Sequence, residues 1–130
     1  MIRNGVAIIF GILMIIAGVM HVINPEFYDK IIPSFIPNIL AHAFALITEV
    51  LIGIALLVPN TNRKGGIGFM LLMLFFMPLH IWELFKEEGT SLVGSTDAAI
   101  VRIVIQVVLI GIGWWIWRGN LPKPLAEDAN

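Results

Sequence analysis

Long apolar segments alternate with short polar ones along this 130-residue chain. Residues 4–23 carry no formally charged side chain, and three further segments with few charges follow at residues 38–58, 65–85 and 97–118. A helix of about 20 residues is long enough to cross the hydrocarbon core of a bilayer. The pattern therefore predicts an all-α fold, a bundle of four transmembrane helices.

The composition supports a membrane protein and excludes several other classes. Hydrophobic residues make up 58% of the chain, charged residues make up 13%, and the mean hydropathy is +0.93. In soluble domains, roughly 45–50% of the residues are hydrophobic and about 25% are charged. The formal net charge is −1, so we expect no nucleic-acid partner, because such a partner requires a basic surface. The chain has no cysteine, which excludes thiolate nucleophiles and disulfide exchange.

The segments suggest one membrane domain with a small addition between its first two spans. We expect residues 1–118 to form this domain and residues 119–130 to form a disordered cytoplasmic tail. A signal peptide is the alternative for the first segment, but its apolar run is too long and no Ala-x-Ala site follows it. Phe27, Ile31 and Phe35 recur every four residues, which predicts a short interfacial helix that is either a lid or a connector.

The distribution of cations predicts the orientation of the four spans. Positive residues gather on the cytoplasmic side of a membrane protein. One side of the predicted bundle carries Arg3, Arg63, Lys64, Arg118 and Lys123. The other side carries Lys30 and Lys86, with Arg102 near its edge. We therefore expect both termini to be cytoplasmic.

Several polar side chains lie inside the predicted spans, where each ionisable one costs roughly 2.5–3.5 kcal/mol. The candidates for a ligand pocket are His21, Glu49, His80, Glu83, Arg102 and Gln106. The spacings of three, four and seven residues between His80 and Glu83, Arg102 and Gln106, and His42 and Glu49 place each pair on one helix face.

These faces predict one polar pocket that opens toward the outer side. Structural roles remain open for these residues. Glu49 is also a candidate for a structural contact with Gln106 or Arg102. The side chain of Arg102 is long enough to extend to the lipid headgroups, and His42 is also a candidate for an interfacial side chain without a special role.

The same residues have some features of a metal site and of a haem site, but neither site is favoured. His80 and Glu83 have the spacing of a metal pair, but bundle metal sites draw carboxylates and histidines from several helices. His21 and His80 lie on different spans, as axial haem ligands do, yet a histidine near the membrane boundary is usually only hydrogen-bonded. We therefore expect neither metal nor haem.

The order of short motifs resembles the DoxX-like family of small bacterial membrane proteins, over roughly residues 5–118. The motifs are Ala17-Gly18-x-x-His21, Asn24-Pro25-x-Phe27, Ile32-Pro33, Ile36-Pro37, Thr48-Glu49-x-x-x-Gly53, Leu56-Leu57-Val58-Pro59, Pro78 with His80, and Arg102-x-x-x-Gln106. Many members have a small residue and Asn after the third-span proline, where this chain has Leu79 and His80. The resemblance implies a four-helix protein of the bacterial cytoplasmic (inner) membrane, a companion of quinone-linked redox enzymes.

Three functions follow as hypotheses. The first is a membrane subunit of a redox system, in which Glu49, Arg102 and His21 line a quinone pocket; quinone is the cofactor that this hypothesis requires. The second is a binding or transport protein for a small amphiphile, and the third is an assembly factor for a larger membrane protein. Because the chain lacks a complete catalytic set, we expect it to act with a partner rather than as an enzyme alone. The sequence leaves a homo-oligomer open.

Overall fold

The computed structural model of the chain describes residues 1–86 and 94–119. The helices within these residues are α1 (Ile2–Ile23), α2 (Glu26–Asp29), α3 (Asn38–Leu57), α4 (Asn62–Glu83) and α5 (Thr96–Gly119). Four of them, all but α2, are long and apolar enough to cross a membrane. The predicted all-α fold with four membrane-spanning helices is confirmed.

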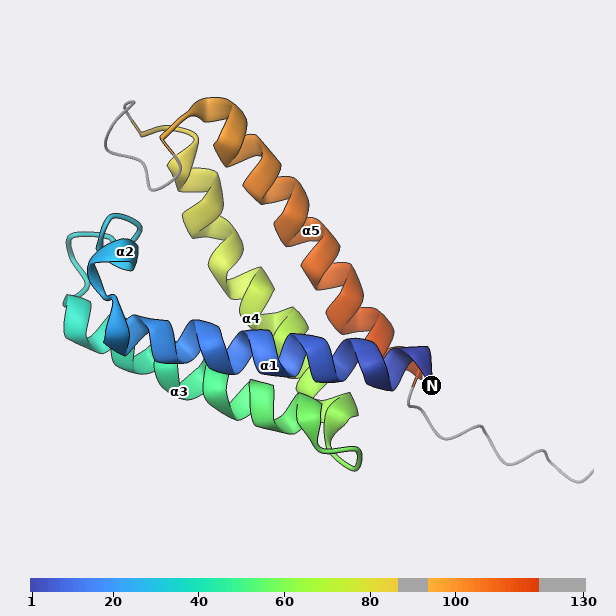
Figure 1. The fold of residues 1–130 in the computed structure, drawn as a ribbon. Coiled ribbons are helices and arrows are strands. Elements are labelled where there is room, and N and C mark those ends of the chain that lie inside the picture. The colour runs from blue at the N-terminus through green and yellow to red at the C-terminus, as the bar shows by residue number, and fades with distance from the viewer. Residues whose placement is uncertain (87–93, 120–130) are drawn as a thin grey trace, which may run out of the picture.

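The helices are arranged as two antiparallel pairs. α1 packs along α3, α4 packs along α5, and α3 touches α4. The two pairs lie close together at the end that holds the N-terminus and the turn between α3 and α4, and they diverge toward α2 (Figure 1). We call these ends the narrow end and the wide end. The buried apolar core includes Ala7, Leu56, Phe69 and Ile116, so the pairs are joined mainly by apolar packing.

Small residues allow the helices within each pair to approach closely. A Cβ atom added to Gly53 would lie 2.7 Å from the carbonyl oxygen of Gly11, which is too close for any side chain. In the second pair, a Cβ added to Gly113 would lie 2.8 Å from the backbone nitrogen of Met70. Small residues at such contacts are typical of helices that associate in lipid, where van der Waals packing replaces the hydrophobic effect.

Replacing Gly53 by leucine should separate α1 from α3. The added side chain would overlap the Gly11 backbone, and we expect the free energy of unfolding to fall by about 1–3 kcal/mol, the usual cost of overpacking. Gly111→Leu is the matched control, because no atom lies within 4 Å of a Cβ at Gly111. Unfolding of both variants in mild detergent would be followed by circular dichroism. Equal stability of the two variants would contradict the close approach of α1 and α3.

Helix boundaries differ slightly from those predicted from charge. α4 begins at Asn62, so Arg63 and Lys64 lie in its first turn rather than before it. The amide of Gly65 donates to the carbonyl of Thr61 at 2.9 Å, and such backbone bonds decide where a helix begins. Charged residues mark the edge of the membrane instead. At the start of α5, the Ser95 hydroxyl accepts a hydrogen bond from the Ala98 amide at 3.2 Å, so Ser95 caps this helix.

The segment between α1 and α3 is less helical than its periodicity predicts. The helix α2 covers only four residues, Glu26–Asp29. Ile31 is buried, whereas Phe27 and Phe35 are exposed, so the three side chains do not share one buried face. Pro33 and Pro37 follow within a short distance, and proline interrupts helical hydrogen bonding. The predicted tail lies outside the described residues, apart from Gly119, which ends α5.

Candidate functional site

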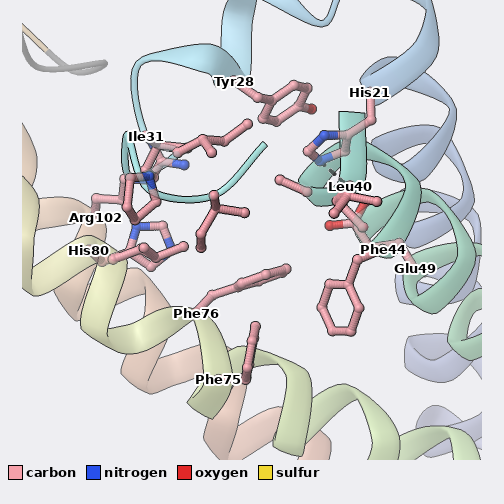
Figure 2. A pocket seen from close by; sticks show the side chains of 16 residues that line it. His21, Tyr28, Ile31, Leu40, Phe44, Glu49, Phe75, Phe76, His80 and Arg102 are labelled. Atoms are coloured by element: carbon pink, nitrogen blue, oxygen red, sulfur yellow. Dashed lines mark ion pairs between the residues drawn. The ribbon is translucent and has the colours of Figure 1, made fainter. Parts of the chain in front are cut away.

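A pocket of about 340 Å³ lies between the two helix pairs at the wide end. Such a volume falls within the range of pockets that bind small molecules. α2 and the segment that follows it cover one side of the pocket (Figure 2), and Ile31 and Ile36 of this segment line it. Its lining comes from every helix: His21 of α1, Tyr28 of α2, Glu49 of α3, His80 of α4 and Arg102 of α5.

Polar side chains occupy two opposite walls of this pocket. His21 and Glu49 lie on one wall, and His80 and Arg102 lie on the other (Figure 2). We call these pairs the α1/α3 corner and the α4/α5 corner. Between the corners, the lining is apolar and aromatic, formed by Ile31, Leu40, Phe44, Phe75 and Phe76. The pocket is therefore amphipathic, with an apolar centre and polar side chains on two opposite walls.

The α1/α3 corner holds a buried carboxyl group whose hydrogen bonding is incomplete. Glu49 is only 6% exposed, and its Oε2 lies 3.9 Å from Nε2 of His21. That distance brings the two groups into electrostatic contact but is too long for a hydrogen bond. Among the residues that the structure describes, Glu49 Oε2 has no hydrogen-bond partner. A buried polar atom in this state is costly and marks a place for a ligand or water.

The α4/α5 corner shows the same feature. His80 is 7% exposed, and its Nδ1 has no hydrogen-bond partner among the described residues. Arg102 brings the guanidinium of α5 to the same wall (Figure 2). The corner thus offers an imidazole nitrogen and a permanent cation. Both are suited to an oxygen atom of a ligand.

Tyr28 connects the cover of the pocket to the α1/α3 corner. Its ring stacks on the His21 imidazole, with 3.7 Å between ring centroids and 17° between planes. Burial raises the pKa of the Tyr28 hydroxyl above its usual value, and the charge of Glu49 adds to this rise while that of Arg102 opposes it. Tyr28 is therefore neutral at physiological pH and acts as an aromatic shield over His21.

Two of the six predicted pocket residues have other partners. Gln106 is buried and donates from Nε2 to the carbonyl oxygen of Met73 at 2.7 Å. Glu83 is also buried, and its Oε1 lies 2.7 Å from Nζ of Lys86. Neither lines the pocket. The other four, His21, Glu49, His80 and Arg102, line the pocket.

His42 and Asp29 belong to the neighbourhood of the site, although neither is among the six residues predicted for the pocket. His42 Nδ1 lies 3.0 Å from His21 Nδ1, and His42 Nε2 lies 2.9 Å from Asp29 Oδ1. Asn38 Nδ2 also donates to Asp29 Oδ1, at 3.0 Å. The seven-residue spacing of His42 and Glu49 indicated a shared helix face, but no sequence signal pointed to Asp29. Among the described residues, no group of three or more His, Asp or Glu side chains is arranged to hold a metal ion.

The cations separate between the two ends of the molecule as the spans predict. At the narrow end, the Arg3 guanidinium lies 4.8 Å from the ring centroid of Trp115, and that of Arg118 lies 5.2 Å from Trp114. At the wide end, Lys86 Nζ donates to the carbonyl oxygen of Lys30. The pocket thus lies at the end with fewer cations.

Fold and site together define a small multi-pass membrane protein with a pocket between its helix pairs. The chain belongs to the family described as a domain of unknown function (DUF8561), whose model matches residues 10–117. Neither the curated proteins nor the solved structures contain a match to the chain. The family assignment therefore rests on the match across residues 10–117, and the function has to be argued from the site.

Proposed function

We propose that this protein binds a quinone in the pocket at its wide end and serves as the membrane subunit or partner of a redox system. The observation that carries the proposal is the pair of buried polar atoms without partners, Glu49 Oε2 and His80 Nδ1, on opposite walls of one apolar pocket. A quinone ring carries carbonyl oxygens on opposite sides. One carbonyl would face each polar corner, and Phe44, Phe75 and Phe76 would contact the ring and tail.

The two corners also suit the chemistry of a quinone. Arg102 and His80 provide donors for a carbonyl oxygen, and Arg102 would stabilise the negative charge that develops there on reduction. On the opposite wall, Glu49 and His21 have side chains of the kinds that serve as proton donors and acceptors in many proteins. Binding and proton exchange are thus divided between the corners. Electrons would come from a partner, because this chain has no cysteine with which to carry them.

The resemblance to the DoxX-like family supports the same proposal. Its motifs include His21, Glu49 and Arg102, three of the four polar residues that line the pocket. We further propose that the protein lies in a bacterial inner membrane with both termini in the cytoplasm. Arg3, Arg63, Lys64 and Arg118 lie at the ends of α1, α4 and α5 that meet at the narrow end (Figure 1), and they support this orientation under the positive-inside rule. The pocket would then open toward the outer side.

An anionic amphiphile is a second candidate for the ligand. The positive charge of Arg102 beside an apolar pocket favours a carboxylate at the head of an acyl chain. A fatty acid would place its single polar head at the α4/α5 corner and leave the α1/α3 corner unfilled. The two ligands therefore differ in their dependence on Glu49.

The test is to identify what the protein holds and then to measure its affinity. Small molecules that remain bound in gentle detergent would be extracted and identified by mass spectrometry. Binding of a short-tailed benzoquinone and of a medium-chain fatty acid would be measured by quenching of the intrinsic fluorescence. We expect quinone to co-purify and to bind more tightly. Fatty acid alone in the extract would reject the quinone proposal in favour of the second candidate.

Replacing Glu49 by methionine should weaken quinone binding about fivefold to tenfold. The substitution removes one neutral hydrogen bond, which contributes about 1 kcal/mol, while it keeps the length of the side chain. Glu49→Gln is the matched variant, because its amide still donates a hydrogen bond, and it should restore most of the affinity. Fluorescence titration with the same quinone measures both. If Glu49→Met binds as tightly as the wild type, the α1/α3 corner does not contact the ligand.

A further inference from the structure

A row of polar side chains leads from α2 to the buried carboxyl group of the pocket. Asp29 Oδ1 lies 2.9 Å from His42 Nε2, and His42 Nδ1 lies 3.0 Å from His21 Nδ1. His21 Nε2 then lies 3.9 Å from Glu49 Oε2. The exposed fractions of the four side chains fall along this row, from 38% at Asp29 through 13% and 11% to 8% at Glu49. The row therefore runs from the surface at the wide end into the protein.

We propose that Asp29, His42, His21 and Glu49 form a proton path between the solvent at the wide end and the pocket. This inference builds on the proposed function, since reduction of a quinone takes up protons as well as electrons. The path itself does not require a ligand, because it ends on Glu49.

Each histidine in the path uses both of its ring nitrogens, which is the arrangement that proton transfer through an imidazole needs. A proton taken from water by Asp29 passes to Nε2 of His42. His42 releases its proton from Nδ1 to Nδ1 of His21, and His21 releases its proton from Nε2 to Glu49. Asp29 and each ring gain one proton and lose one, so the net result is a proton moved from the solvent to Glu49, whose carboxylate becomes neutral.

The surroundings of the path favour this exchange. Asn38 Nδ2 donates to Asp29 Oδ1 at 3.0 Å, which stabilises the carboxylate that remains at the outer end. Tyr28 covers the face of His21 and limits direct contact of that ring with water. His80 and Arg102 face Glu49 from the opposite wall (Figure 2). The last step, at 3.9 Å, needs a side-chain rotation or one bridging water to bring the groups within hydrogen-bonding distance.

The alternative to a proton path is a latch that only holds α2 against α1 and α3. The two differ in what happens when His42 is replaced. Loss of a latch opens the wide end to water, so Glu49 would exchange its proton faster. Loss of a path leaves Glu49 buried without its route, so exchange would become slower. His42→Gln is the informative variant, because its amide can keep hydrogen bonds to Asp29 and His21 but cannot carry a proton through.

The experiment measures hydrogen–deuterium exchange at Glu49 in ligand-free protein. Infrared spectra would follow the acid band that Glu49→Gln lacks, after rapid transfer into D₂O at the pH where this band is half its maximum. We expect His42→Gln to slow exchange about tenfold to a hundredfold, the range for one positioned proton-transfer group. Asp29→Asn should slow it as well. Asn38→Ala removes a contact of α2 but no proton-carrying group, so it should slow exchange much less than His42→Gln does, whereas loss of a latch contact would speed exchange.

Exchange in His42→Gln that is as fast as in the wild type, or the lack of any exchanging Glu49 band, would overturn the proton path. The result is independent of the quinone proposal, because His42 does not line the pocket and its replacement by glutamine should leave quinone affinity unchanged. The exchange experiment can therefore support the proton path even if the protein binds no quinone, and quinone binding can be found even if the path is rejected.

Discussion

Replacing Ala41 by phenylalanine should weaken quinone binding strongly while the protein stays folded. Ala41 lines the pocket from α3, and a phenyl group there would occupy part of a cavity of only about 340 Å³. We expect a loss of affinity of about a hundredfold, which corresponds to about 3 kcal/mol of steric overlap with the ligand. The two polar corners keep their side chains in this variant. The measurement is the same fluorescence titration with a short-tailed benzoquinone.

Ile47→Phe is the matched control for this variant. Ile47 lies on the same helix but is exposed on the outer surface of the bundle, where an aromatic ring contacts lipid or detergent. Its affinity for quinone should equal that of the wild type. Circular dichroism should show the same helix content and a similar unfolding temperature for both variants. Quinone affinity that is unchanged in Ala41→Phe would place the ligand elsewhere in the protein.

The sequence predicted the helices well because each depends on local composition. The four spans follow from long stretches with few charges, and the separation of cations between the ends follows from their order along the chain. The pairing of α1 with α3 and of α4 with α5 was harder to predict. It depends on close contacts such as that of Gly53 with Gly11, which bring together residues far apart in the sequence. Gly111 shows the difficulty, because it looks equivalent to Gly113 in the sequence but faces open space.

The site was predicted in part, for a related reason. Helical spacing places His21, Glu49, His80 and Arg102 on faces that converge, but it does not decide which neighbour a long side chain contacts. Gln106 lies one turn from Arg102 and bonds to the Met73 carbonyl instead. Asp29 could not be predicted at all. Its contact with His42 depends on how the prolines at positions 33 and 37 return the chain across the wide end.

Incomplete hydrogen bonding at both corners shows that stability alone does not account for the pocket. Glu49 and His80 would each cost less if they were replaced by apolar residues of similar size. Membrane proteins in general retain such polar groups where they serve a ligand or a proton. The pocket residues should therefore show a trade-off, in which a substitution that harms binding leaves stability unchanged or improves it.

Arg102→Met should show this trade-off most clearly. Removal of the guanidinium takes away a charged hydrogen-bond donor, which contributes about 1.5–3 kcal/mol, so quinone affinity should fall about tenfold to a hundredfold. The free energy of unfolding should change by less than about 1 kcal/mol, because methionine spares the cost of a partly buried cation. Glu83 also keeps its ion pair with Lys86, at 2.7 Å. Fluorescence titration and unfolding in the same detergent measure the two effects together.

Gln106→Met provides the opposite case on the same helix. Gln106 holds α5 to α4 through the Met73 carbonyl and does not line the pocket. Its replacement should lower the free energy of unfolding by about 0.6–1.7 kcal/mol, as for other hydrogen bonds between membrane helices, with quinone affinity unchanged. Arg102→Met is thus expected to affect binding but not stability, and Gln106→Met is expected to affect stability but not binding. If Arg102→Met instead destabilises the protein and binds quinone normally, Arg102 is a structural residue and the α4/α5 corner is not a ligand site.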